Sequence, residues 1–158
     1  MKIKINHILM AMAAVLLLLC GWSVYRPIHF ADEKSERETA VKQRLLEIRR
    51  AEEAYRQRQG TYAGTFSQLV TSSLLADSMR FVPYSGGKEF ELAATVLTGK
   101  SGSTTPVMEC GAPYSSYLAG LAQNSIAELT EEANRRGEYA GLKIGDITTP
   151  NDNAGNWE

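Results

Sequence analysis

The chain has 158 residues, of which 44% are hydrophobic and 22% charged, and its formal net charge is −1. A near-neutral chain without a basic cluster lacks the electrostatic footprint of nucleic-acid binding, so we expect no nucleic acid among its partners. Of the two cysteines, Cys20 lies inside the apolar N-terminal segment and Cys110 lies far down the soluble part, so we expect no disulfide framework and a fold that depends on packing.

The N-terminal residues predict a membrane anchor. Residues 1–7 contain Lys2 and Lys4 and no acidic residue, and residues 8–25 contain no charge. About 18 helical residues span roughly 27 Å, close to the thickness of the hydrocarbon core. Lysines before the span favour a cytoplasmic N-terminus, and Trp22 suits the far interface. We therefore expect a transmembrane helix over 8–25 in a bacterial inner membrane, crossed once, with the C-terminal domain in the periplasm.

Two other interpretations of this segment stay open. It could be a cleaved signal peptide, although no clear site with small residues precedes the polar region. It could also be a lipoprotein signal that ends at Cys20, because leucines precede this cysteine and Gly21 follows it, although its direct neighbour Leu19 is larger than usual.

After a juxtamembrane linker at 26–31, which contains Pro27, the pattern from Asp32 to Tyr62 predicts one long amphipathic helix. Apolar residues recur at spacings of three and four, and Glu52 is the one polar residue among them. Gly60 is placed to end this helix in a left-handed conformation. The residues expected to form the structural core of this stem helix are Val41, Leu45, Ile48, Ala51, Tyr55, Gly60 and Tyr62.

The rest of the chain predicts a small α+β domain, so that the periplasmic domain covers 32–158. Thr65 and Gln68 have capping-box spacing for a short helix at 65–71. Alternation indicates strands at 90–97 and 106–110, joined by a Gly/Ser/Thr-rich loop as a hairpin. A helix capped by Asn124 or Ser125 and ending at Gly137, then a last strand at 142–147, complete the prediction of a long helix packed on a small antiparallel sheet.

The chemistry of the side chains argues against an enzyme. The two histidines, His7 and His29, both flank the predicted span, so the domain lacks the base for serine or cysteine nucleophiles and the usual zinc ligands. Four oxygen-bearing residues close to the C-terminus suit calcium as the one cofactor to consider. They are Asp146, Asn151, Asp152 and Asn153. Their spacing fits no EF-hand loop, and Asx turns beside Pro150 explain them as well.

The run from the stem into the domain resembles type IV pilins and the major pseudopilins of type II secretion. The residues that carry this resemblance are Ile48, Ala51, Ala54, Tyr55, Gly60, Tyr62 and Leu69. It implies a transmembrane helix continuing into a stem on which a small antiparallel sheet packs. The chain departs from the pilin pattern because residues 1–7 lack the glycine of the peptidase site and residues 8–25 lack the glutamate. It also resembles uncharacterised single-span bacterial envelope proteins with a similar ending at 153–158.

Three functions follow as expectations. The first is a pseudopilin-like structural subunit of an envelope or secretion-type assembly, whose partners are the inner membrane, its own copies or other envelope proteins. The second is a monomeric tethered binding or scaffold protein of the same fold. The third is a lipid-anchored variant of either, with Cys20 modified.

Overall fold

The computed structural model describes residues 5–100 and 102–158, and for residues 5, 6 and 22–28 it describes the backbone alone. The chain divides into two compact units, Met1–Ser35 and Glu36–Glu158. The elements in chain order are α1 (Ile5–Gln59), α2 (Phe66–Thr71), the 3₁₀ helix η1 (Asp77–Arg80), β1 (Glu91–Thr98), β2 (Thr104–Pro113), α3 (Tyr114–Tyr117), α4 (Gln123–Arg136) and β3 (Gly141–Gly145).

The first helix differs from the predicted division into span, linker and stem. Residues 26–31, predicted as a linker, are helical and belong to α1. A proline inside a helix removes one hydrogen bond and bends the chain, but it does not have to end the helix, and this explains the wrong prediction at Pro27. Residues 1–4 of the predicted cytoplasmic N-terminus, and the side chain of Trp22, lie outside the described residues. Among those that are described, no helix combines the length and apolarity needed to cross a membrane.

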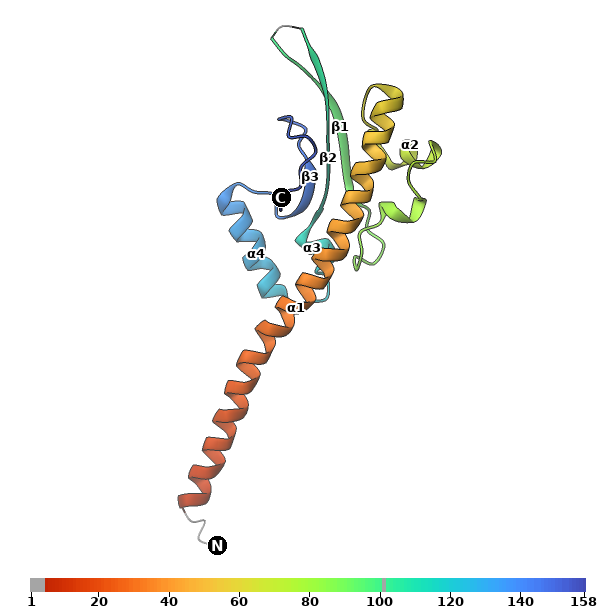
Figure 1. Ribbon diagram of the computed structural model, residues 1–158. Coiled ribbons are helices and arrows are strands. Elements are labelled where there is room, and N and C mark those ends of the chain that lie inside the picture. The colour runs from red at the N-terminus through yellow and green to blue at the C-terminus, as the bar shows by residue number, and fades with distance from the viewer. Residues whose placement is uncertain (1–4, 101) are drawn as a thin grey trace. The chain divides into compact units, whose positions relative to one another are not determined.

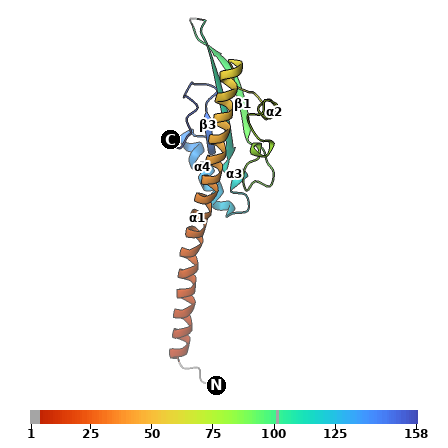
Figure 2. The same cartoon turned by 45° about the vertical axis from the view of Figure 1, so that its right-hand side comes forward.

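From residue 36 on, α1 lies along one face of the sheet (Figures 1 and 2). Val41, Leu45 and Ile48 are fully buried and Ala51 almost so, because spacings of three and four place them on the same side of the helix. The helix ends at Gly60, whose φ of 79° is left-handed and costs a glycine little. The amphipathic pattern therefore identified the face of α1 that packs.

The three strands form an antiparallel sheet in the order β1-β2-β3. Glu91 pairs with Gly111 in the β1–β2 hairpin, and Glu109 pairs with Gly145 between β2 and β3. Alternation sends one set of side chains toward α1, and the fully buried members of this set are Met108, Cys110, Ala112 and Ile144. The predicted α+β class, with a long helix packed on a small antiparallel sheet, is thus confirmed.

Several helix and strand boundaries differ from the predicted ones. The capping box of α2 is present, and the side chain of Gln68 accepts the backbone N–H of Thr65 at 3.2 Å. The helix α4 begins at Gln123 with Ala122 at its N-cap, so both predicted caps, Asn124 and Ser125, lie inside the helix. The last strand, predicted to run to residue 147, ends at Gly145, where a φ of 70° turns the chain. Asp146 therefore lies in the loop after β3 and not in the strand.

Candidate functional site

The C-terminal tail is bound to the end of the stem helix by a group of polar side chains, which we call the tail clamp: Arg49, Arg56, Tyr62, Asn153 and Glu158. The amide nitrogen of Asn153 donates to the hydroxyl of Tyr62 at 2.8 Å, and Arg56 donates to the same hydroxyl at 3.0 Å. Arg49 donates to a carboxylate oxygen of Glu158 at 3.0 Å. Residues 91 positions apart thus meet in a buried hydrogen bond, which holds the tail against α1.

Glu52 lies deeper in the same region and is fully buried. Its Oε2 accepts the backbone N–H of Ala63 at 2.8 Å, while its Oε1 has no hydrogen-bond partner among the described residues. Burial raises the pKa of Glu52 from 4.5 to about 7, although the hydrogen bond from Ala63 acts in the opposite direction. Near neutral pH this carboxyl can therefore carry a proton inside the core.

A small cavity of about 80 Å³ opens beside the tail clamp, and the four predicted calcium ligands all border it. They are Asp146, Asn151, Asp152 and Asn153. Asn151 and Asp152 are exposed, whereas Asn153 is buried and its side chain donates to Tyr62. Arg56 also lines the cavity and brings a positive charge to it.

Within the described residues, no three or more His, Cys, Asp and Glu side chains form a group that could hold a metal ion. Calcium binding stays a prediction.

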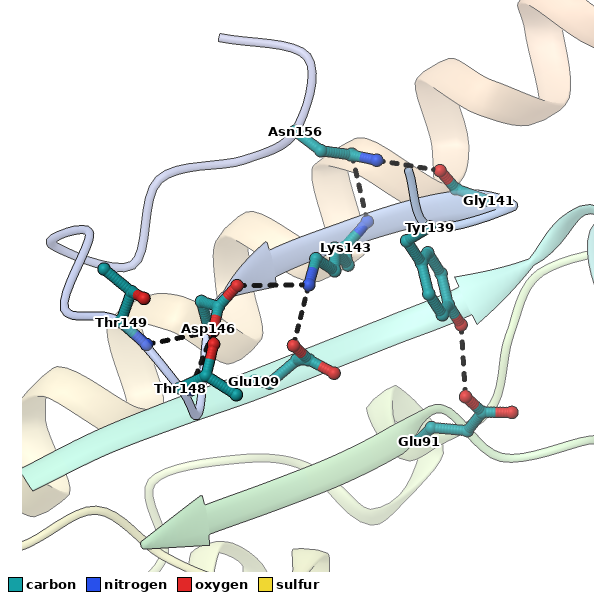
Figure 3. Close-up of polar contacts among 9 residues, drawn as sticks. All are labelled: Glu91, Glu109, Tyr139, Gly141, Lys143, Asp146, Thr148, Thr149 and Asn156. Carbon is teal, nitrogen blue, oxygen red and sulfur yellow. Dashed lines mark hydrogen bonds and ion pairs between the residues drawn. The ribbon is translucent and has the colours of Figure 1, made fainter. Parts of the chain in front are cut away.

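The carboxylate of Asp146 is engaged by its own neighbours, as Figure 3 shows. Its Oδ1 accepts hydrogen bonds from the hydroxyl and the backbone N–H of Thr148 and from the backbone N–H of Thr149. These bonds lower the pKa of Asp146 to about 2, and the bond from the Thr148 hydroxyl has the largest effect. Its Oδ2 lies 3.6 Å from the amine of Lys143, which also pairs with Glu109 at 2.8 Å. This arrangement is an Asx-type turn that starts the tail.

The face of the sheet that carries Lys143 is polar. Tyr139 donates to Glu91 at 3.1 Å (Figure 3). The side chains of Tyr139 and Lys143 cover Gly111 on β2. Burial raises the pKa of Tyr139, and the carboxylate of Glu91 adds to this effect. These pairs hold β1, β2 and the chain before β3 together.

The apolar segment of α1 is the other notable surface. Its large side chains have exposed fractions from 49% at Ile8 to 74% at Leu18. Five consecutive residues, 15–19, are all exposed, and because they cover more than one helical turn the segment is apolar on every side. Cys20 is exposed at its end.

Comparison with models of protein families, with curated proteins and with solved structures finds no match.

The sequence predicted the burial of some of these residues but not the contacts that they make. Tyr62 is buried as part of the core, Tyr55 is half-buried, and Gly60 is exposed as a helix end. Glu52 was recognised as a polar residue on the apolar face, but that position alone did not indicate the turn at Ala63 that it binds. The contact between Tyr62 and Asn153 joins distant segments and left no local signal.

Proposed function

We propose that this protein is a non-enzymatic, pseudopilin-like structural subunit of an envelope or secretion-type assembly. In this proposal residues 8–25 anchor it as a single transmembrane helix in a bacterial inner membrane, and the domain from residue 36 on lies in the periplasm. The observation that carries the proposal is that α1 is apolar on all sides in its first part and forms the core of a small α+β domain in its last part.

The physical argument concerns the exposed apolar side chains of residues 8–19. Moving one large apolar side chain out of water stabilises by about 1.5–3 kcal/mol, so nine of them supply a strong drive toward lipid or toward neighbouring helices. Lys2 and Lys4 stand before the uncharged segment and favour a cytoplasmic N-terminus. Both effects agree with a tethered domain.

The assembly part of the proposal is supported by the resemblance of the stem to pilins and pseudopilins, together with the packing of α1 against a small antiparallel sheet. A structural role is supported by the residue types of the domain. From residue 36 on the sequence contains no histidine, and its one cysteine, Cys110, is fully buried with a raised pKa because of that burial. A thiol in that state is a poor nucleophile.

A monomeric tethered protein of the same fold is the second candidate. The observation in its favour is the charge on the open side of the stem, where Glu47, Arg50 and Glu53 are exposed. Charged helix faces pack poorly against neighbouring stems, because each buried charge must find a partner. A lipoprotein anchored at Cys20 is a variant of either candidate.

The test is intact-mass spectrometry of the mature protein extracted from its native membrane, after carbonate washing of that membrane. We expect a carbonate-resistant chain that begins at Met1. A start at Cys20 with added acyl mass would replace the helical anchor by a lipid, and recovery in the carbonate wash would exclude an anchor. Chemical crosslinking in the same membranes separates the two main candidates, since ladders of this chain support assembly and a single monomer band supports the tethered monomer.

A further inference from the structure

A cleft of about 440 Å³ opens beside the tail clamp, between the last turns of α1 and the C-terminal tail. Its volume lies in the usual range of small-molecule sites in proteins. The side chains that line it are all polar or carry a polar group. They are Glu53, Arg56, Gln57, Tyr62, Asp152 and Asn153. A cleft with this lining suits a small polar molecule.

The fold holds both walls of this cleft in place. One wall is the stem helix, whose opposite face is buried against the sheet. The other wall is the tail, which runs along the edge of the sheet at β3. There Gly145 donates to the carbonyl of Ala154 at 3.0 Å, and Asn156 donates to that of Lys143 at 3.0 Å. Because the tail clamp also joins the two walls, a ligand meets groups that are already ordered, which lowers the cost of binding.

The cleft contains acceptor groups that the fold does not use. Glu53 and Asp152 are exposed, and in the described part of the chain no hydrogen bond or ion pair engages either carboxylate. Asn153 is only 7% exposed, and its Nδ2 donates to Tyr62, but its Oδ1 accepts no hydrogen bond from a described residue. The polar atoms of such buried side chains normally have a partner. These three groups therefore favour a ligand that brings N–H donors.

Arg56 adds a group of the opposite charge to the cleft. Its Nη1 donates to the hydroxyl of Tyr62 at 3.0 Å, and its Cζ lies 5.3 Å from the centre of the Tyr62 ring, so the guanidinium has a defined position. Its Nε and Nη2 make no hydrogen bond to the residues that the structure describes. These two nitrogens form the side of a guanidinium that can bind a carboxylate through two parallel hydrogen bonds.

We propose that this cleft binds a free basic amino acid such as lysine, which carries two ammonium groups and one carboxylate at neutral pH. The cleft presents the complementary set, two carboxylates and one guanidinium. Its single net negative charge is thus opposite to the single net positive charge of the ligand. In the complex the ammonium groups pair with Glu53 and Asp152 and donate to the Oδ1 of Asn153, while the carboxylate pairs with Arg56.

Other small charged ligands leave part of this set unmatched. A diamine lacks the carboxylate for Arg56, and an acidic amino acid brings a second carboxylate toward Glu53 and Asp152. A metal cation is repelled by the guanidinium and cannot bind to it. The site goes beyond the proposed function, because amino-acid binding needs neither the membrane anchor nor an assembly.

Isothermal titration calorimetry of the full-length chain in detergent tests the class of ligand. We expect L-lysine to bind one-to-one with a dissociation constant of about 1 mM or tighter. Norleucine lacks the side-chain ammonium and cadaverine lacks the carboxylate, so each should bind about threefold to fivefold more weakly, the effect of losing one partly exposed ion pair. The absence of saturable lysine binding, or equal binding of all three compounds, would overturn the proposal.

Two variants test the place of binding. Glu53→Gln and Asp152→Asn each remove one negative charge and keep the shape of the side chain. Asparagine also tolerates the left-handed backbone of Asp152, whose φ is 55°. We expect the dissociation constant of lysine to rise about threefold to fivefold in each variant.

Glu128→Gln is the matched control, because it removes the same charge at an exposed position on α4 and should leave the dissociation constant unchanged. If this control weakened lysine binding as much as the two cleft variants, or if neither cleft variant weakened it, lysine would not bind in the cleft. Circular dichroism melting checks that all three variants are folded. Carbonate resistance reports the anchor separately, so failure of either proposal is recognisable by itself.

Discussion

Glu52 on α1 accepts the backbone N–H of Ala63 through Oε2 at 2.8 Å, and so a buried carboxyl joins the helix to the chain that leaves it. The second oxygen of this carboxyl has no hydrogen-bond partner among the described residues, and the side chain is fully buried. An ionised carboxylate in that position destabilises the fold, because one oxygen loses its hydration and gains no hydrogen bond in return. The surroundings therefore favour the neutral acid, and for this reason the pKa of Glu52 is raised to about 7.

The first prediction concerns the pH dependence that follows. The pKa of Glu52 is about 7 in the folded chain and close to 4.5 when unfolded, so the folded state binds more protons between these values. Its contribution to stability is fully present below pH 4.5 and is lost as the pH rises through 7. We expect the free energy of unfolding, measured with urea, to fall by about 2 kcal/mol from pH 5.5 to pH 8.5.

The matched control is Glu52→Gln, which keeps the shape and the acceptor for Ala63 but cannot titrate. This variant should lose most of the pH dependence in that window and be at least as stable as the wild type at pH 8.5. Asp146, with a pKa of about 2, does not titrate there. If both proteins showed the same slope with pH, another group would be responsible for it.

The second prediction concerns the tail clamp. Tyr62→Phe removes the hydroxyl that accepts the amide of Asn153 and leaves that buried donor without its partner. We expect a loss of about 1–3 kcal/mol in the free energy of unfolding, measured by chemical denaturation. Tyr84→Phe is the comparison, because Tyr84 is exposed and its hydroxyl bonds to Glu36 at the surface. Equal effects of the two substitutions would show that the bond to Asn153 contributes little.

The third prediction concerns the core of the stem. Ile48 is fully buried against the sheet, and Ile48→Asp would bury a charge with no partner, at a cost of several kcal/mol. Since small domains are stable by only about 5–15 kcal/mol, we expect no cooperative unfolding transition in circular dichroism. Gln43→Asp, at an exposed position of the same helix, should keep its transition within about 0.5 kcal/mol of the wild type. A cooperatively folded Ile48→Asp protein would disprove the packing.

The fourth prediction concerns calcium. The Oδ1 of Asp146 is engaged by Thr148 and Thr149, and the amine of Lys143 lies 3.6 Å from its Oδ2, so binding a cation would require these contacts to break. We expect the melting temperature to be the same in millimolar calcium and in excess chelator. A rise of several degrees with calcium that Asp146→Asn removes would instead establish a site in the tail.

The sequence by itself determined the class of the fold and the packing face of the stem. Spacings of three and four predicted the buried positions Val41, Leu45 and Ile48, and alternation predicted the hairpin, because both periods follow from local backbone geometry. Gly60 and Gly137 could be recognised as helix ends for the same reason, since a left-handed residue is a local requirement. Helix continuity at Pro27 was mispredicted, because proline weakens a helix without excluding it.

Only the tertiary structure decided the long-range relationships. The turn that Glu52 binds, the bond between Tyr62 and Asn153, and the covering of β3 by the tail each join segments whose separation no periodic pattern encodes. The position of β1 as an outer strand of the sheet belongs to the same class, because a strand is an edge only by virtue of what lies beside it. Local periodicity specifies which side of an element is buried, whereas the partner that buries it depends on how the whole chain closes on itself.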